Sequence, residues 1–499
     1  MKHKMRKQIR KTVIILLWLI VWQIAAVWTN NHILLVGPVQ VLKTFVQNMV
    51  QPDFIKSVFF SFARIGLGFF LALCVGLLFG AVGYRFPIVQ ELLEPVMATL
   101  RSIPVASFVV LLLIWFGSSK LSFFVSFLIV FPNVYVNTIA GLKSADAKLL
   151  EMAKVFGIGR LNRFFYIYRP ALMPYLSSCL KISLGMSWKS GVAAEVIGLP
   201  DFSLGERLYM SKIYLDTAGL FAWTLTIVII SFLFEKAVLL LIKIFGEWKP
   251  YPMLSQKIVT RAEISSSMIV PDANAVSVQS GSTDGIEVSH ISKSFGDLIV
   301  LKDYSLTMEK GQRYFMMAPS GTGKTTFLRI LTGLDNADEG AITGMSLHTG
   351  MVFQEDRLCE EYNAVCNIML GMGKSKGRDQ YKENSGRGMS RTQTVQFVRQ
   401  EAAKILPEDC LTKPVKELSG GMRRRVALLR AVLSASELLI LDEPFAGLDE
   451  ENRLRSAEYL LEHSEGRTLL VTTHREDDVK LLRGEKVALV FSESLCYNA

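Results

Sequence analysis

Long apolar runs fill the first half of the chain, whereas the second half alternates short apolar segments with polar ones. The runs lie around Val13–Trp28, Val58–Val82, Val105–Phe116, Phe123–Leu142, Leu172–Ile197 and Phe221–Phe245. With flanking residues, each is near the roughly 20 residues that a helix needs to cross a bilayer. We therefore predict an all-α membrane domain with six transmembrane helices, followed by an α/β domain.

Basic residues are distributed unevenly among the loops between these runs. Lys and Arg are frequent in Met1–Lys11 and Lys143–Arg169, and few in Gly117–Leu121 and Pro200–Asp216. Basic loops usually lie in the cytoplasm. We therefore expect a multi-pass protein of the plasma membrane, with the N-terminus and the α/β domain both in the cytoplasm.

The N-terminal pattern has a second interpretation. A basic stretch followed by an apolar run is also typical of a signal peptide. No A-x-A-like cleavage site follows the run, and Trp18, Trp22 and Trp28 interrupt it. A retained first span in the lipid bilayer is the interpretation that we prefer.

Composition argues against other classes of protein. With 50% hydrophobic residues, the chain is too apolar for an ordinary soluble protein of 499 residues. The net charge of +10 could favour nucleic-acid binding, but many Lys and Arg residues flank apolar runs, and we expect no nucleic-acid partner. The six cysteines show no C-x-x-C spacing, so we expect reduced thiols and no metal–thiolate site.

The change in composition also divides the chain into domains. Residues 250–285 are rich in Ser, Gly and Pro and lack sustained periodicity, which is typical of a flexible linker. We expect the membrane domain at 1–249, this linker, and the α/β domain at 286–499. A basic, aperiodic stretch at 371–393 predicts a disordered insertion rather than a lipid or nucleic-acid site.

The α/β domain carries a Gly-rich loop between a predicted strand and a predicted helix. The loop Ala318–Thr326 reads Ala-Pro-Ser-Gly-Thr-Gly-Lys-Thr-Thr and follows the apolar run Tyr314–Met317. Such a loop directs backbone N–H groups and the positive end of a helix at phosphate. Lys324 would meet the β/γ oxygens of ATP, and Thr325 would meet Mg²⁺. The candidate binding residues are Ser320, Gly321, Thr322, Gly323, Lys324, Thr325 and Thr326.

Ala318 stands where this motif usually has its first glycine. Alanine tolerates the position only if its φ angle is negative. The sequence therefore predicts a phosphate loop with one conformational condition on it.

Polar residues end three further apolar segments. Gln354 follows Met351-Val-Phe, Asp442 and Glu443 follow Leu438-Leu-Ile-Leu, and His474 follows Leu469-Leu-Val-Thr-Thr. We expect Asp442 to reach Mg²⁺ through a water molecule, and Gln354 to hold Mg²⁺ or the attacking water. Glu443 would polarise that water, and His474 would contact the γ-phosphate. The candidate catalytic residues are therefore Glu443, His474 and Gln354, and the metal candidates are Thr325, Gln354 and Asp442.

Other positions also suit a nucleotide. Ser419, Gly420 and Gly421 open a predicted helix, which makes a second helix N-terminus suited to phosphate. Asp449 follows in Phe445-Ala-Gly-Leu-Asp and is a further candidate. Phe295 precedes the phosphate loop as an adenine-stacking aromatic would, although a core phenylalanine is equally compatible with the sequence.

Ionisable residues also occur within or near the predicted spans. Burying a charge in lipid is costly, which makes Arg64, Lys189 and Glu195 candidates for a substrate path. Snorkelling to the interface, or pairing with another helix, is the more common explanation of such residues. Both interpretations stay open.

The loop Lys143–Arg169 contains a predicted amphipathic helix, Ala145–Phe156, which Gly157 ends. Glu151-Met-Ala-Lys-Val-Phe-Gly157 and Ile167-Tyr-Arg-Pro170 resemble the E-A-A…G…I-x-L-P loop of binding-protein-dependent ABC importer permeases, with Met152 in place of alanine and Arg169 in place of leucine. Further motifs narrow the resemblance to nitrate/sulfonate/taurine-type permeases: Arg101-Ser-Ile-Pro104, Ile114-Trp-Phe-Gly117, Ser187-Trp188 and Ala194-Glu195. The alternative is an interfacial helix without a partner.

The region from Ile286 to about Val490 resembles an ABC nucleotide-binding domain, and Met422, where glutamine is commoner, also occurs in nitrate/sulfonate-type ATPases. The resemblance implies ATP and Mg²⁺ as cofactors and a homodimer that shares ATP between the phosphate loop of one copy and Ser419-Gly-Gly of the other. It also implies an extracytoplasmic solute-binding protein. Sulfonate, taurine, nitrate and thiamine-precursor pyrimidines are all compatible solutes.

Two other functions fit parts of the sequence. A half-transporter of the ABC exporter type also runs from membrane domain to ATPase, but exporters resemble neither the Glu151–Pro170 loop nor the short spacing between spans. A membrane-anchored regulatory ATPase would hydrolyse ATP without moving a solute. The importer is the function that the sequence favours.

Overall fold

The computed structural model describes residues 2–29, 31, 33–248, 251, 285–319, 322–344, 349–372, 391–434 and 436–487. The chain divides into two compact units. The helical unit comprises Met1–Ser144 and Ala171–Trp248, and the α/β unit comprises Ala145–Pro170 and Lys249–Ala499. The loop 145–170 therefore belongs to the α/β unit, although residues of the helical unit precede and follow it in the sequence. Most of the predicted linker and residues 373–390 of the predicted insertion lie outside the described residues.

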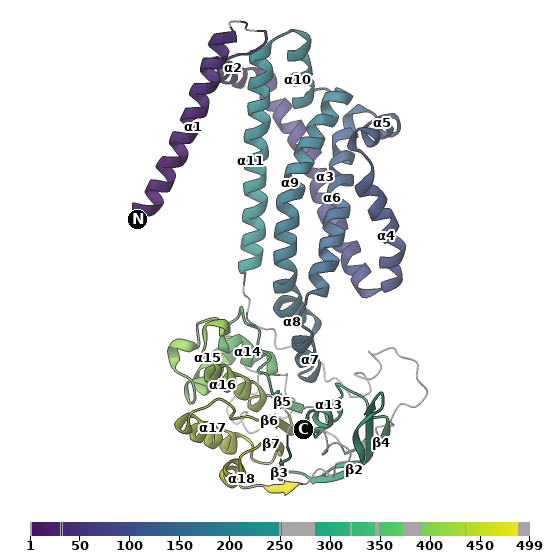
Figure 1. Ribbon diagram of the computed structural model, residues 1–499, viewed down its shortest axis with the longest axis vertical. Coiled ribbons are helices and arrows are strands. Elements are labelled where there is room, and N and C mark those ends of the chain that lie inside the picture. The colour runs from purple at the N-terminus through teal and green to yellow at the C-terminus, as the bar shows by residue number, and fades with distance from the viewer. Residues whose placement is uncertain are drawn as a thin grey trace. The chain divides into compact units, whose positions relative to one another are not determined.

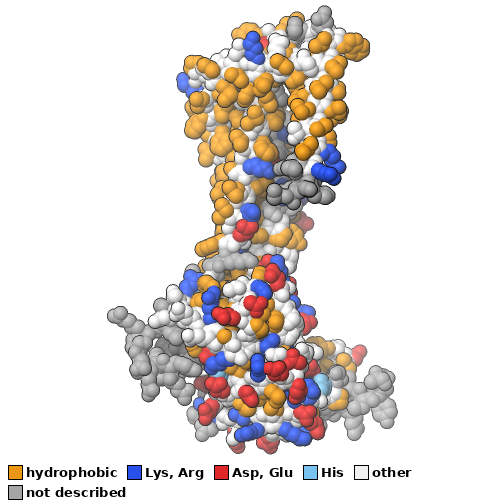
Figure 2. All heavy atoms as spheres, turned by 90° about the vertical axis from the view of Figure 1, so that its left-hand side faces the viewer, with side chains coloured by type: hydrophobic (Ala, Val, Ile, Leu, Met, Phe, Trp, Pro, Cys, Tyr) orange, Lys and Arg blue, Asp and Glu red, His pale blue; other side chains and the backbone are white. Residues whose placement is uncertain are grey.

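Helices account for the secondary structure of the first unit, as predicted (Figure 1). They are α1 (Lys2–Thr29), α2 (Pro38–Met49), α3 (Pro52–Arg85), α4 (Pro87–Ser102), α5 (Val105–Phe116), α6 (Ser118–Lys143), α9 (Arg169–Gly198), α10 (Leu204–Ile213) and α11 (Thr217–Glu247). Hydrophobic side chains cover much of this unit's visible face in Figure 2, whereas charged side chains are frequent on the α/β unit. This surface suits a lipid environment.

A test of helix length and hydropathy finds fewer candidate spans than the six that the sequence predicted. Among the described residues, four helices pass it: Thr12–Thr29 of α1, α3, α6 and α11. A fifth is possible if α4 and α5 count as one span, but the pair bends by 103° at the Ile103–Pro104 break. The expected span around Val105–Phe116 is thus only a short helix, and the count of six stays a prediction.

Glycines let α3 and α6 approach closely. A Cβ atom added at Gly68 would lie 2.3 Å from the backbone oxygen of Phe123, and one at Gly76 would lie 2.8 Å from the side chain of Val134. Small residues let the backbones of two helices pack closely in a membrane, where the hydrophobic effect does not drive the helices together. The α3–α6 contact therefore depends on residues without side chains.

The α/β unit contains two sheets, in agreement with the predicted fold class. One is three-stranded and antiparallel, in the order β2 (Leu298–Glu309), β1 (Gly285–Phe295), β4 (Glu339–Thr343). The other is five-stranded and parallel, in the order β5 (Thr349–Val352), β6 (Leu438–Asp442), β7 (Thr468–Thr472), β3 (Arg313–Met316), β8 (Glu485–Val487). The helices are α7 (Ala147–Val155), α8 (Arg160–Arg163), α13 (Lys324–Leu331), α14 (Ala364–Gly371), α15 (Arg391–Ala403), α16 (Gly420–Val432), α17 (Glu450–His463) and α18 (Glu476–Leu482), with a π-helix at Phe164–Tyr168 and 3₁₀ turns at Glu408–Cys410 and Val415–Glu417.

The parallel sheet explains where the predicted site residues gather. Every residue of β6 and β7 is buried, as expected for parallel strands covered on both faces. Parallel strands also bring their carboxyl ends to one edge of the sheet, where ligands of open α/β sheets bind. The segments that follow β3, β5, β6 and β7 therefore meet at one edge.

The close approach of α3 and α6 yields a test. Gly68→Ala should lower the midpoint of thermal unfolding of the detergent-solubilised chain, because overpacking typically costs about 1–3 kcal/mol. Gly185→Ala is the matched control, since an added Cβ on this α9 glycine meets nothing within 4 Å. A midpoint that falls equally in both variants would contradict the packing argument.

Candidate functional site

A pocket of about 350 Å³ lies at the carboxyl edge of the parallel sheet. Its lining comprises Phe295, Val300, Thr322, Gly323, Lys324, Thr325, Thr326, Gln354, Asp442, Glu443 and His474. All of these except Val300 are candidates from the sequence, contributed by segments far apart along the chain. The volume is in the range of small-molecule sites.

The phosphate loop has the predicted strand–loop–helix form. β3 ends at Met316 and α13 begins at Lys324, with Gly323 as its N-cap at φ +85°. A Cβ at Gly323 would also lie 3.0 Å from the backbone oxygen of Val300, so both conformation and space require glycine. The φ angle of Ala318 is not positive, so the condition on alanine at this position is met. Ser320 and Gly321 lie outside the described residues.

Lys324 turns its amine back onto the phosphate loop. Its Nζ atom donates to the backbone oxygen of Ala318 and to that of Pro319, the latter at 3.0 Å. Burial lowers the pKa of the amine, and the carboxylates of Glu443 and Asp442 oppose that effect. A phosphate in the pocket would offer this amine stronger acceptors than the loop carbonyls do.

Asp442 and Glu443 occupy the end of β6 in different environments. Asp442 is buried and accepts a hydrogen bond from Thr472 Oγ1 at 2.5 Å. Burial raises the pKa of Asp442, and the Thr472 bond opposes the rise. Glu443 has φ +49°, an uncommon value for a side chain of its size and one that often marks functional sites. The strained backbone presents its carboxylate to the pocket.

His474 lies beside Glu443. Its Nε2 atom is 3.2 Å from Glu443 Oε1, and the two residues follow the neighbouring strands β7 and β6. The structure thus brings together the two strongest catalytic candidates, together with Gln354 from the segment after β5. Their roles remain predictions.

Phe295 is 53% exposed and lines the pocket, so it is not the core phenylalanine that the sequence also allowed. Lys293 Nζ lies 5.4 Å from the centroid of its ring. The exposed ring face is suited to stacking on a base.

The remaining nucleotide candidates do not line this pocket. Ser419 caps α16 and accepts from the N–H of Met422 at 3.4 Å, and Gly420 has open space where a Cβ would be. A Cβ atom added at Gly421 would lie 3.3 Å from the backbone oxygen of Gly447. Asp449 caps α17, and hydrogen bonds from Asn452 lower its pKa. A single chain therefore does not bring these four residues to the phosphate loop.

The pocket also contains oxygen donors suited to Mg²⁺. The Thr325 hydroxyl, the Gln354 amide and the Asp442 carboxylate all belong to its lining, and Mg²⁺ prefers such hard ligands. No group of three or more His, Cys, Asp or Glu side chains arranged for a metal occurs in the described part of the chain.

Sequence reasoning missed Arg424 of α16. This buried side chain donates to the backbone oxygens of Phe353 at 2.6 Å and Glu443 at 2.7 Å, and also to that of Asp442. It therefore ties the ends of β5 and β6 to the helix that Ser419 caps. Its only signal was a run of three arginines, Arg423–Arg425, which does not reveal that the middle one is buried.

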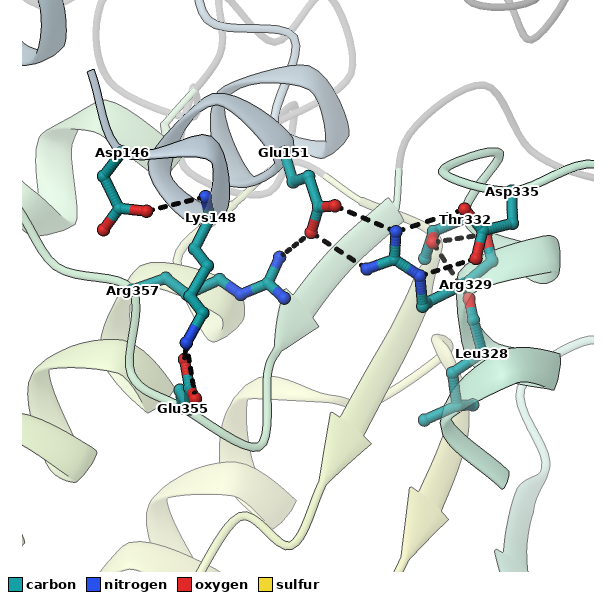
Figure 3. Close-up of polar contacts among 9 residues, drawn as sticks. All are labelled: Asp146, Lys148, Glu151, Leu328, Arg329, Thr332, Asp335, Glu355 and Arg357. Atoms are coloured by element: carbon teal, nitrogen blue, oxygen red, sulfur yellow. Dashed lines mark hydrogen bonds and ion pairs between the residues drawn. The ribbon is translucent and has the colours of Figure 1, made fainter. Parts of the chain in front are cut away.

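The predicted inner-loop helix is α7, and its N-cap is Asp146. On α7, the Glu151 carboxylate accepts from both Nη atoms of Arg329 at 2.9 and 2.8 Å and from Arg357 at 2.6 Å (Figure 3). Arg329 also bonds to Asp335, so one guanidinium joins two carboxylates. The same helix bonds to Glu355 through Lys148, in an exposed ion pair.

Apolar contacts accompany these ion pairs. Met152 and Ala153 of α7 are fully buried, together with Phe156, in the same core cluster as Met351 of β5. The guanidinium carbon of Arg430 lies 5.1 Å from the centre of the Phe156 ring. The loop is thus part of the hydrophobic core of the α/β unit, which excludes the alternative of a helix without a partner.

Hydrogen bonds from Arg329 are the main cause of a lowered pKa of Glu151. Because the folded-state value is depressed, the contact stabilises the fold above the unfolded-state pKa of glutamate, about 4.3. This stabilisation is lost only as pH falls through the lower folded-state value. At neutral pH the contact is permanently charged.

Two family models match the chain. Residues 72–247 match the binding-protein-dependent transport system inner membrane component, and residues 301–446 match the ABC transporter model. The chain belongs to the ABC transporter family. It fuses a permease domain to an ABC ATPase domain, and such domains bind ATP and hydrolyse it to power transport.

Curated relatives of this ABC transporter match its ATPase part. The aliphatic sulfonates import ATP-binding protein of Nocardia farcinica is 35% identical over 206 residues, which are 41% of this chain and 77% of the relative. The taurine import ATP-binding protein of Pseudomonas aeruginosa is 33% identical, over 38% of this chain and 71% of the relative. The sulfate/thiosulfate import ATP-binding protein of Xanthomonas campestris is 33% identical over 41% of this chain. The match spans 61% of the length of that relative.

The position of Glu443 generates a test. Glu443→Gln should retain ATP binding and lower ATP turnover about 10²-fold or more, because the amide cannot polarise water as a carboxylate does. Glu437→Gln is the matched control, since Glu437 is exposed just before the same strand. Lys324→Ala should weaken ATP binding itself. Unchanged hydrolysis by purified Glu443→Gln protein would refute the assignment.

The ion pairs of Glu151 and Lys148 on α7 generate a second test. Glu151→Ala leaves the Arg357 guanidinium without its carboxylate and Arg329 with Asp335 alone, so it should lower the midpoint of thermal unfolding clearly. Glu355→Ala removes a carboxylate from an exposed pair, which is worth roughly 0–1 kcal/mol, and should change the midpoint little. Equal shifts in the two variants would show that Glu151 does not anchor the loop.

Proposed function

We propose that this ABC transporter is one half of an ATP-driven importer of the plasma membrane, with its ATPase domain in the cytoplasm. Two copies would assemble, and a separate extracytoplasmic solute-binding protein would deliver the solute. The observation that carries the proposal is the inner loop. Glu151 and the buried Met152 anchor α7 to the ATPase domain, and the sequence around them resembles the loop of importer permeases. The sequence of this loop does not resemble a half-transporter of the exporter type.

The roles of the nucleotide residues belong to the same proposal. Lys324 and the phosphate loop would hold the β- and γ-phosphates, and Phe295 would stack on adenine. Glu443 would polarise the attacking water, with His474 and Gln354 placed around it. A Mg²⁺ ion held by Thr325, Gln354 and Asp442 would neutralise phosphate charge.

Dimerisation follows from the residues that do not line the pocket. Ser419, Gly420, Gly421 and Asp449 are all at or near helix N-termini, yet none belongs to the pocket of their own chain. The hydroxyl oxygen of Ser419 accepts a hydrogen bond in its own helix cap. The open space beside Gly420 leaves room for a ligand. We therefore assign these residues to the ATP bound by a second copy.

By analogy with the named relatives, whose names refer to import of sulfonates, taurine and sulfate, the solute would be a small compound with a sulfonate or sulfate group. Nitrate and thiamine-precursor pyrimidines remain candidates from the permease motifs. The buried Glu195 accepts from Ser61 Oγ at 2.7 Å and from the N–H of Gly205 at 3.3 Å. These contacts favour a role in which Glu195 pairs with other helices over a place on the solute path.

Uptake into proteoliposomes tests the proposal. The full chain would be reconstituted with ATP on the ATPase side and a candidate solute-binding protein on the other side, and given labelled taurine, methanesulfonate, sulfate or nitrate. An importer moves solute toward the ATP side. An exporter moves solute the other way, and a regulatory ATPase hydrolyses ATP without moving any.

Gly157 gives the sharpest variant. It follows α7 with φ +59°, a conformation that side chains rarely adopt. Gly157→Asp should leave ATP binding intact, reduce uptake severely and abolish stimulation of hydrolysis by loaded binding protein. Gly159→Asp is the matched control, because Gly159 has an ordinary φ of −59°. Normal uptake by Gly157→Asp would show that the loop is not the bridge between ATPase and permease.

A further inference from the structure

Arg169 departs from the importer motif, which has leucine before its proline, and its side chain is 2% exposed. A buried arginine is costly unless its donors are satisfied. Arg169 Nη2 donates to the hydroxyl of Tyr362 at 2.8 Å, and its guanidinium carbon lies 5.6 Å from the centre of the Phe165 ring. The arginine that replaces the leucine of the motif therefore makes a specific contact with Tyr362.

Tyr362 completes the contact on the ATPase side. Its hydroxyl accepts from Arg169 and donates to the backbone oxygen of Phe165 at 2.7 Å. Its ring also lies 4.4 Å, centre to centre, from the ring of Tyr166. Burial raises the pKa of Tyr362, which keeps its hydroxyl protonated and able to donate.

The backbone of the loop prepares the acceptor. Phe164–Tyr168 is a π-helix, and the N–H of Arg169 donates to the oxygen of Phe164, five residues back. The next residue, Pro170, has no N–H to donate in the same register to Phe165. Beside this π turn, the Phe165 carbonyl accepts the hydrogen bond from the Tyr362 hydroxyl. Such π turns are frequent at functional sites.

The segment that carries Tyr362 connects to both parts of the nucleotide machinery. It begins after Gln354, which lines the pocket. The backbone oxygen of Tyr362 accepts from the N–H of Val415, at the turn that leads to Ser419. A movement at either the pocket or the Ser419 helix would reach Tyr362 through this short segment.

We propose that Arg169, Tyr362 and the Phe165 carbonyl form a latch through which nucleotide-driven movement of the ATPase domain reaches α9. The latch is separate from the Glu151 contact, because it holds the other end of the loop, where α9 begins. Neither Arg169 nor Tyr362 lines the nucleotide pocket, so both are positioning residues. The inference deepens the proposed importer function and rests on it.

The latch is tested by the ratio of solute transported to ATP hydrolysed, measured for the full chain in proteoliposomes. Arg169→Leu removes a hydrogen bond from a charged group, so it should lower this ratio about tenfold or more. Tyr362→Phe should lower it at least about threefold. The double variant should be no worse than Arg169→Leu, since the two residues act as one unit. ATP hydrolysis should stay within about twofold, and Arg169→Lys should retain more coupling than Arg169→Leu.

Tyr459→Phe is the matched control. This buried tyrosine also donates a hydrogen bond within the ATPase domain, to Glu401 at 2.9 Å, but it lies on α17. A normal transport ratio in Tyr362→Phe overturns the latch. So does an equal loss in Tyr459→Phe, because the effect would then be a general consequence of removing a buried hydroxyl.

A second measurement separates this inference from the importer proposal. Tyr214 is 77% exposed between α10 and α11, and Tyr214→Cys in a Cys74→Ala/Cys496→Ala background offers a thiol to maleimide. In detergent, ATP should change the labelling rate, and Tyr362→Phe should abolish the change. If the parent chain imports nothing but shows this response and Tyr362→Phe loses it, the latch stands and the importer function fails. An undiminished response in Tyr362→Phe, or a parent chain in which ATP alters neither uptake nor labelling, overturns the latch.

Discussion

Burial of the parallel sheet on both faces is the constraint on which the rest of the ATPase domain depends. β6 and β7 expose no residue along their length, so only the strand ends can present polar groups to a ligand. The parallel direction places those ends at one edge. Glu443 and His474 come within 3.2 Å of one another for this reason, although neither strand encodes the contact by itself.

The same covered sheet receives the inner loop. α7 packs against β5, and its apolar side chains enter the core that surrounds the sheet. Arg430 of α16 lies over the Phe156 ring and also donates to the backbone oxygens of Asp356 and Arg357. Burial lowers the pKa of Arg430 to about 10, which still leaves it charged at neutral pH. The loop, the segment after β5 and the Ser419 helix therefore form one connected body.

Local sequence signals predicted much of this architecture. The Gly-rich loop, the apolar strands with polar ends and the helix before Gly157 depend on residues close in sequence, and each appears in the structure. The bend between α4 and α5 escaped prediction, because apolar composition does not reveal a change of direction at Ile103–Pro104. Arg424 and Tyr362 escaped for a different reason. Their partners lie far away in sequence, and a polar residue in a polar stretch gives no sign of burial.

The loop contact also has a consequence for the order in which the chain matures. Glu151 and Arg357 are 206 residues apart, so at typical synthesis rates the carboxylate waits roughly 10–40 s before its second arginine exists. Until then the apolar face of α7, with Met152 and Phe156, has no core to enter. Met152 and Phe156 can therefore be buried only after the ATPase domain has been synthesised.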